Sequence, residues 1–491
     1  MLKVQFMFYA TDMKSLNMVV QLKHPVFHLL QETAQELGIP TYVVGGFVRD
    51  RLMQRPFKGD IDIVCFGSGI ALAKALKKKH PKAGPISIFK TYGTAMLPIE
   101  DIELEFVGAR KESYHPDSRN PEVATGSLED DQNRRDFTVN AMAISLNKDD
   151  YGALIDPFNG QQDLKKQLIR TPNDPDTTFA DDPLRMLRAI RFATKLEFNI
   201  VPEALASITA NADRMTIVSR ERCTEELHKI LACPKPSTGF LLLEKTGILQ
   251  HLLPELTALK GIEEIEGHKH KDNFYHTLEV VDNICPHTNN VWLRWAALLH
   301  DIGKAPTKKF IPPTGWTFHG HEFVGAKMVY RLFKRLRMPL NEKMKYVQKL
   351  VLLSSRPIAL VDAQVTDAAV RRLIFDAGPV LDDLFTLCQA DITTKNPRRF
   401  TRYHDNFKRV RDKIEVVEER DRIRNFQPPI TGEMIMEYFN IPPSKAIGTI
   451  KEAIKEAILE GEIPNALEAA KAKMIAEGKK LGLKAQTPND A

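Results

Sequence analysis

A pair of glycines followed by two spaced aspartates is the feature that most constrains this chain. The apolar run 42–44 predicts a buried strand, and Gly45 and Gly46 end it in a tight turn where the backbone can come close to a phosphate. Asp60 and Asp62 open a second predicted strand. Because strand side chains alternate between the two faces, both carboxylates point the same way. Two carboxylates beside such a turn can hold Mg²⁺ against a nucleoside triphosphate.

The order of these parts makes the pattern specific, although each part alone is weak evidence. Asp-x-Asp arises easily by chance in a chain with 63 acidic residues, and Gly-Gly turns are usually structural. Here both parts lie on predicted strands, and Arg49 follows the turn where a triphosphate would lie. The combination therefore indicates a nucleotide-binding site.

Length and composition favour a multidomain protein of the cytoplasm. The chain has 491 residues, more than the ~250–300 residues that one core usually holds. No apolar run approaches the ~20 residues that span a bilayer, so we expect no membrane association. The start of the chain lacks a convincing signal-peptide core, and Met13 is an alternative first residue.

Cysteine usage and net charge add two weaker constraints. The five cysteines are scattered and include no Cys-x-x-Cys, which argues against a thiolate zinc site and a disulfide framework and is typical of a reducing cytoplasm. The net charge of +6 permits nucleic-acid binding, but a solvated surface explains it equally well. The oligomeric state stays open.

The residue patterns predict mixed α/β structure up to about residue 160 and mainly helices from 162 onward. An amphipathic helix is expected over 20–38, and the polar, proline-broken stretch 111–122 is expected to be a mobile loop. The further predicted strands are 60–65, 86–89, 94–98, 102–107, 139–146 and 153–156. A helix over 182–193 has Pro183 in its first turn and arginines 185, 188 and 191 along one face, and another helix lies near 220–232.

Two further motifs carry a family resemblance. They are Arg134-Arg135-Asp136-Phe-Thr-Val-Asn140 and the run Ile-Asp-Pro-Phe-Asn-Gly at 155–160. With these the chain resembles the class II tRNA nucleotidyltransferases, or CCA-adding enzymes, and their bacterial poly(A) polymerase relatives, in the polymerase β-type nucleotidyltransferase superfamily. The resemblance rests on five ordered motifs over 42–232 and continues more loosely to about 465.

The resemblance implies roles for the residues of the first half. Asp60 and Asp62 would ligate two Mg²⁺ ions, which activate the tRNA 3′-hydroxyl and neutralise the leaving pyrophosphate. Glu105 is the candidate third carboxylate, although Glu103 and Glu105 could also form one solvated strand face. Residues implied to hold the triphosphate and ribose are Gly45, Gly46, Arg49, Arg134, Arg135, Asp136 and Asn140.

The family selects the incoming base with a Glu-Asp-x-x-Arg motif that opens a helix, without a nucleic-acid template. Here Asp182 and Arg185 match, while Asp181 replaces the usual glutamate. A carboxylate accepts from the exocyclic amine of cytosine or adenine, and uracil and guanine present the wrong pattern. Arg188 could bind phosphate or lie on the helix surface. By analogy, the loop 111–122 would help to switch specificity from C to A.

A second constellation resembles an HD domain, which binds a divalent metal through His, His-Asp and a distant Asp. The matching residues are His276, His300, Asp301 and Asp391, with His319 and His321 as possible further ligands. Such ligands suit Mn²⁺, Fe²⁺, Ni²⁺ or Mg²⁺, and a metal-bound water could attack a phosphoester. The domain could equally serve as a tRNA-binding scaffold.

The implied fold is an α+β nucleotidyltransferase head followed by all-α domains that include the HD domain. The expected parts are an N-terminal tail (1–24), the catalytic head (25–160), a helical nucleotide-selecting and RNA-binding domain (161–254), the HD domain (255–410) and a helical tRNA-binding region (411–491). The leading hypothesis is CCA addition to tRNA from CTP and ATP. The alternatives are a poly(A) polymerase, an A-only or C-only adding enzyme, and an HD phosphohydrolase acting on nucleotides or 2′,3′-cyclic phosphates.

Overall fold

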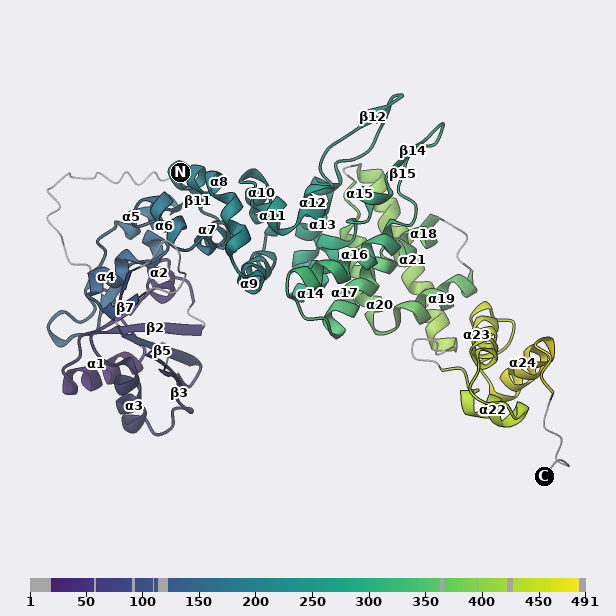
Figure 1. Ribbon diagram of the computed structural model, residues 1–491, viewed down its shortest axis with the longest axis horizontal. Helices are drawn as coiled ribbons and strands as arrows, with labels where there is room; N and C mark the ends of the chain where they lie inside the picture. Colours follow the sequence, from purple (N-terminus) through teal and green to yellow (C-terminus); the bar gives the residue numbers. More distant parts are fainter. Residues whose placement is uncertain are drawn as a thin grey trace, which may run out of the picture. The chain divides into compact units, whose positions relative to one another are not determined.

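The computed structural model describes residues 19–56, 59–90, 93–108, 110–113, 122–362, 366–394, 396–421 and 427–484 (Figure 1). The chain forms two compact units. The first is Met1–Val218 with Lys245–Ile248, and the second is Ser219–Glu244 with Leu249–Ala491. Among the described residues, no helix combines the length and apolar character needed to cross a membrane.

A seven-stranded mixed sheet organises the first unit, in the order β3-β4-β5-β2-β1-β8-β9. Its strands are β1 (Thr41–Val44), β2 (Gly59–Cys65), β3 (Ser87–Phe89), β4 (Thr94–Ile99), β5 (Ile102–Gly108), β8 (Ala143–Ser145) and β9 (Leu154–Ile155). Strands β2 and β5 are parallel, and the other neighbours are antiparallel. The prediction of one strand over 139–146 was partly wrong, because Thr138–Asn140 form a 3₁₀ turn and the strand begins at Ala143.

Helices pack against this sheet and continue beyond it in the first unit. They are α1 (Val26–Glu36), α2 (Gly46–Leu52), α3 (Gly69–Lys79), α4 (Leu128–Asn133), α5 (Gly160–Lys166), α6 (Pro175–Asp181), α7 (Leu184–Leu196) and α8 (Pro202–Ala210), with the short parallel pair β10 (Leu168–Ile169) and β11 (Asn199–Ile200). Helices α1 and α3 contact each other, and α3 packs on β4 and β5 (Figure 1). Apolar side chains of both helices, such as Phe27, Leu30 and Leu72, join those of the strands in one buried core.

Two predictions about local structure in this unit need correction. The helix expected over 20–38 begins only at Val26, since Pro25 lacks the amide that a helix interior needs. The residues before it are not helical; Val20 and Leu22 are buried in the core, and Val19 bridges to Ala153. The stretch 111–122 is not irregular throughout, because β6 (Arg110–Ser113) pairs with β7 (Glu122–Thr125); the intervening 114–121 lie outside the described residues.

The second unit is mainly helical. Its helices are α9 (Arg220–Leu231), α10 (Pro236–Lys245), α11 (Ile248–Leu252), α12 (Pro254–Thr257), α13 (Asn273–Ile284), α14 (Val291–Leu299), α15 (Lys304–Thr307), α16 (His321–Arg335), α17 (Glu342–Leu353), α18 (Arg356–Asp362), α19 (Asp367–Ala377), α20 (Leu381–Ala390), α21 (Pro397–Asp421), α22 (Gly432–Phe439), α23 (Lys445–Glu460) and α24 (Leu467–Lys480). Helix α14 contacts α13, α17 and α20 around the fully buried Trp295. This arrangement brings the ends of α13, α14 and α20 together.

The predicted α+β head followed by helical domains is confirmed, with one refinement. The helical part also contains two short hairpins that extend from the helices (Figure 1). They are β12 (Glu264–Ile265) with β13 (His268–Lys269), and β14 (Lys309–Ile311) with β15 (Gly315–Thr317). The predicted helix near 220–232 corresponds to α9.

Candidate functional site

The glycine turn after β1 is crowded by charged side chains. The antiparallel register of β1 and β2 pairs Val44 with Asp62, which places that carboxylate beside Gly45. Gly45 has a φ of 74°, and a Cβ there would lie 2.7 Å from Asp62 Oδ2 and 3.2 Å from Arg135 Nη1. Only glycine combines that backbone conformation with the missing side chain, so the turn requires glycine for two reasons.

Three carboxylates gather next to this turn. The parallel register of β2 and β5 pairs Asp60 with Glu103 and Asp62 with Glu105. Burial raises the pKa of Asp62, and the nearby Asp60 adds to this while Arg135 opposes it. Burial also raises the pKa of Glu105, followed by repulsion from Asp62, Asp60 and Glu103. Glu105 is thus close enough to both aspartates to interact with them, and this set of hard oxygen donors fits Mg²⁺.

Asp131 on α4 is a member of the site that the sequence reasoning missed. Its side chain is fully buried, and it accepts hydrogen bonds from Arg135 Nε at 2.9 Å and Arg134 Nε at 3.0 Å. Although burial acts to raise it, the two arginines hold the pKa of Asp131 below its usual value. The signal was available, because an acid three and four residues before two arginines is a helical ion-pair spacing. Asp131 therefore holds both arginines, of which Arg135 lies beside the glycine turn.

A second chain of polar contacts joins α2 to α7. Arg49 is 3% exposed, and its Nη1 donates to Asn140 Oδ1 at 2.7 Å. Asn140 Nδ2 donates to Asp136 Oδ1 at 3.1 Å, and Arg188 Nε donates to Asp136 Oδ2 at 2.8 Å. The ring of Phe192 lies 5.3 Å from Arg49 Cζ, another contact that the sequence reasoning missed. The structure therefore brings together four of the predicted nucleotide-binding residues.

The predicted base-selecting residues lie at a junction of two helices. The helix expected from 182 begins only at Leu184, while Asp181 ends the preceding α6. Asp182 is extended (φ −140°, ψ 99°) because the residue before a proline disfavours the helical conformation. Arg185 Nη2 donates to the backbone oxygen of Arg134 at 2.7 Å. This bond links the base-selecting helix to the residue that precedes Arg135, the arginine beside the glycine turn.

The HD residues form a compact cluster in the second unit. His276 lies on α13, His300 and Asp301 follow α14, and Asp391 follows α20. His276 Nε2 lies 2.8 Å from Asp391 Oδ1 and 3.8 Å from Asp301 Oδ2. His300 Nε2 lies 3.4 Å from Asp301 Oδ2 and 3.6 Å from Asp391 Oδ1. The ligand atoms of His276, His300 and Asp391 all lie within 4.8 Å of one another.

The surroundings of His300 fit a divalent metal. Its Nδ1 lies 2.8 Å from the Ala297 carbonyl oxygen, and its buried Nε2 has no hydrogen-bond partner among the described residues. Although burial acts to lower it, the adjacent Asp301 and Asp391 raise the pKa of His300 to about 10. A buried imidazole nitrogen aimed at two carboxylates is the donor set of a transition-metal site.

The two additional histidines differ in position. His321 is half-buried, and its Nε2 lies 3.7 Å from Asp301 Oδ1, which places it at the edge of the cluster. His319 is exposed and lies outside the group of His276, His300 and Asp391. Lys304 Nζ lies 2.6 Å from Asp301 Oδ2, a contact that the sequence reasoning did not anticipate.

Three family models match consecutive parts of the chain. One described as a poly A polymerase head domain matches residues 41–170, and one described as a probable RNA and SrmB-binding site of polymerase A matches 197–260. An HD domain model matches 273–371. The first range contains the predicted metal-binding and nucleotide-binding residues from Gly45 to Asn140, but the base-selecting segment lies outside it. The third range contains His276, His300 and Asp301.

Comparison with known proteins identifies the family. The A-adding tRNA nucleotidyltransferase of Deinococcus radiodurans is 32% identical over 79% of this chain and 88% of its own. A multifunctional CCA protein of Pseudomonas fluorescens is 34% identical over 74% of this chain and 82% of its own. The CCA-adding enzyme of Bacillus stearothermophilus in complex with CTP has a similar fold, with a TM-score of 0.65 and 23% identity over 94% of this chain and 99% of that one. The chain therefore belongs to the class II tRNA nucleotidyltransferases, the family of the CCA-adding enzymes, with a poly A polymerase-type head, an RNA-binding region and an HD domain.

Proposed function

We propose that this protein adds CCA to the 3′ end of tRNA from CTP and ATP without a template and releases pyrophosphate. The observation that carries the proposal is the convergence of Asp60, Asp62 and Glu105 beside Gly45 and Arg135. The turn gives the phosphates of a nucleotide access to the backbone, and Arg135 provides positive charge next to them. The three carboxylates would hold Mg²⁺, which supplies charge neutralisation and an activated 3′-hydroxyl when bound.

We propose that Asp182 and Arg185 read the incoming base. A carboxylate at Asp182 accepts from an exocyclic amine, and the Arg185 guanidinium has donors for ring acceptors. Arg185 uses one donor on the Arg134 carbonyl and another on the Thr178 carbonyl at 3.3 Å, so its position is fixed before a base arrives. Cytosine and adenine would fit this pair, and uracil and guanine would leave its polar groups unpaired.

Relatives differ in which nucleotides they add, so the specificity requires its own test. One relative is an A-adding enzyme and others are CCA-adding proteins. The protein would be incubated with Mg²⁺ and tRNA transcripts that end at the discriminator base, at C or at CC. Each transcript would receive CTP, ATP, both, or UTP and GTP, and the products would be sized to one nucleotide.

With both CTP and ATP, we expect addition to every transcript to stop at CCA. We expect UTP and GTP to be rejected. Addition of A to the CC-ending transcript alone would instead make the protein an A-adding specialist. An open-ended ladder of A would make it a poly(A) polymerase. Absence of any addition would contradict the proposal.

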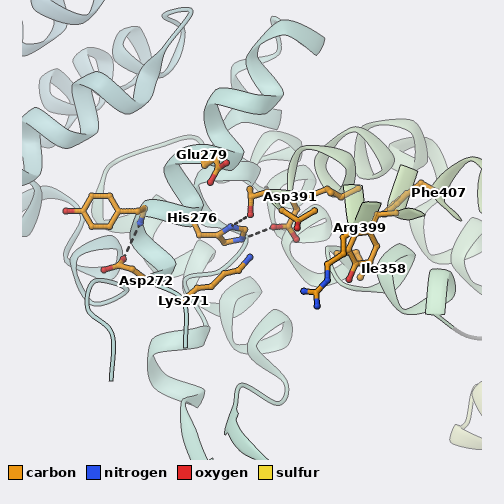
Figure 2. Close-up of a pocket in the computed structure, with 13 residues that line it drawn as sticks. Lys271, Asp272, His276, Glu279, Ile358, Asp391, Arg399 and Phe407 are labelled. Carbon is orange, nitrogen blue, oxygen red and sulfur yellow. Dashed lines mark hydrogen bonds and ion pairs between the residues drawn. The ribbon is translucent and has the colours of Figure 1, made fainter. Parts of the chain in front are cut away.

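A second candidate function is hydrolysis of phosphoesters at the HD cluster. The observation that favours it is that His276 and Asp391 line a cavity of about 640 Å³, so a metal held there would face an accessible ligand (Figure 2). His276, His300, Asp301 and Asp391 would hold Mn²⁺, Fe²⁺, Ni²⁺ or Mg²⁺, which supplies an activated water when bound. The Thr393 hydroxyl lies 3.1 Å from His276 Nδ1 and orients that ring.

A further inference from the structure

The buried Asp131 on α4 divides its two carboxylate oxygens between two arginines. Its Oδ1 accepts a hydrogen bond from Arg134 Nε at 3.0 Å, and its Oδ2 accepts one from Arg135 Nε at 2.9 Å. The side chain of Asp131 has no surface exposed to solvent, so it does not itself face a nucleotide or a metal ion. Any effect of Asp131 on nucleotide addition must therefore pass through the groups that it holds.

Helix α4 is short, but contacts at its start and along its buried face hold it in place. A capping box of Ser127 and Asp130 fixes its first turn. Gln132, the residue after Asp131, is 2% exposed, and its Nε2 donates to the Ala141 carbonyl oxygen at 2.8 Å, just before β8. Asp131 therefore stands on a helix that is anchored to the sheet region, and its carboxylate has a defined position.

Arg135 has two carboxylates within reach. A Cβ at Gly45 would lie 3.2 Å from Arg135 Nη1 and 2.7 Å from Asp62 Oδ2, so the guanidinium and that aspartate are neighbours. The two groups also attract each other, since Arg135 opposes the effect of burial on the pKa of Asp62. Among the described residues, however, Arg135 forms its ion pair with Asp131 and not with Asp62. Asp131 thus holds the Nε side of the guanidinium while the Nη1 side stays at the glycine turn.

We propose that Asp131 is a positioning residue that keeps Arg135 from pairing with Asp62, so that the guanidinium meets the nucleotide phosphates and Asp62 is left for a metal ion. Direct pairing of Arg135 with Asp62 would offset the negative charge that a cation requires there. A guanidinium held through Nε still offers its Nη donors, which fit phosphate oxygens. The inference rests on the proposed function for its substrate, but it concerns the placement of one side chain, which can be measured without turnover.

CTP binding without turnover tests the placement of Arg135. The full-length protein would be titrated calorimetrically with CTP in EDTA, which removes divalent ions and prevents addition. We expect Asp131→Asn to weaken CTP binding about tenfold, the effect of about one lost charge-assisted hydrogen bond. Glu129→Gln is the control, because it removes one exposed negative charge from the same helix and should not weaken binding. Unchanged or tighter binding by Asp131→Asn would overturn the inference.

The Mg²⁺ dependence of addition tests the release of Asp62. In Asp131→Asn, Arg135 is free to turn to Asp62 and compete with the metal ion. The Mg²⁺ concentration that gives half the maximal rate of CMP addition should therefore rise about tenfold, by the loss of about one charged contact. Structural damage alone would lower the rate at every Mg²⁺ concentration without moving the half-saturation point, and that result would contradict the proposal.

Substitutions of Arg135 test whether the effect passes through it. In an Arg135→Gln background, Asp131→Asn should change neither CTP binding nor the Mg²⁺ requirement further, since both substitutions remove one interaction. Effects that add in full would refute the positioning role. Arg135→Lys leaves the buried carboxylate in place, but one ammonium cannot serve Asp131 and the phosphates together, so CTP binding should weaken as in Asp131→Asn. Wild-type CTP binding by Arg135→Lys would also refute that role.

Failure of this inference and failure of the proposed function have different signatures. If the wild-type protein adds no nucleotide to tRNA but Asp131→Asn weakens CTP binding as expected, the proposed function is wrong and the placement of Arg135 stands. If the wild-type protein adds CCA and Asp131→Asn matches it in both CTP binding and Mg²⁺ dependence, the inference alone is overturned.

Discussion

The carboxylates of the head and those of the HD cluster differ in the side chains that lie beside them. In the head, Asp62 and Glu105 repel each other across β2 and β5, and burial raises the pKa of both. In the HD cluster the pKa of both aspartates is lowered despite burial, because His300 lies beside Asp301, and His276 and His300 lie beside Asp391. The head therefore places its carboxylates beside one arginine, Arg135, that only partly offsets them, whereas the HD cluster places histidines beside its carboxylates. Similar carboxylates thus contribute to one cluster of oxygen donors, which suits Mg²⁺, and to one mixed cluster of carboxylate and imidazole donors, which suits transition metals.

Removing a head carboxylate should have the largest effect on nucleotide addition. We expect Asp62→Asn to lower incorporation of CMP into a tRNA ending at its discriminator base by about 10³-fold, since several kcal/mol of charge stabilisation depend on that oxygen. Hydrolysis at the HD cluster should not change. The exposed Asp101 in the turn before β5 gives the control Asp101→Asn. Near-normal addition by Asp62→Asn would show that the carboxylates do not form the reaction centre.

Distorting the glycine turn should have the next largest effect. A Cβ at Gly45 would displace Asp62 or Arg135, and misplacement of a reacting geometry by about 1 Å can cost about 10²-fold in rate. Gly448→Ala, on α23, is the control, because a Cβ there would meet no atom within 4 Å and this glycine lies outside the nucleotide site. The initial rate of CMP addition should be about 10²-fold lower for Gly45→Ala than for the control variant. Equal rates would mean that the turn tolerates a side chain and that the proposed contact is unimportant.

Disabling the HD cluster should have the smallest effect on addition. His276→Ala removes a potential metal ligand and the contact to Asp391. We expect addition to stay within about twofold, because the two sites belong to separate compact units and independent sites contribute additively, while hydrolysis of bis(p-nitrophenyl) phosphate with Mn²⁺ is lost. Tyr275→Phe, on the same helix, controls for general damage to α13. Loss of both activities in His276→Ala would refute the independence of the two sites.

The sequence predicted those parts of the fold that follow from local periodicity. The apolar run before Gly45 and the alternating pattern from Asp60 to Cys65 appear as neighbouring strands. It did not predict the pairing of β2 with β5, because register depends on strands that lie far apart in the chain. The resemblance identified Glu105 as a candidate, and the register explains how it reaches Asp62.

The missed residues share a physical reason. Asp131 and Phe192 act through partners that are visible only in three dimensions, the Arg134–Arg135 pair and the buried Arg49. A buried aspartate looks like any surface acid in the sequence, since burial is a property of the fold. The late start of α7 was predictable, because the proline at 183 restricts the residue before it.

The hydrogen bond from Arg185 to the Arg134 carbonyl couples the proposed base-reading residue to the segment proposed to bind phosphate. In the proposed roles, Arg185 reads the base, and its position depends on the backbone of Arg134. A substitution at Arg185 that broadens nucleotide choice would also loosen the backbone of Arg134, which precedes the Arg135 beside Gly45. Variants selected for altered nucleotide choice should therefore arise with slower turnover, and compensating changes should appear on α4 rather than on the base-selecting helix.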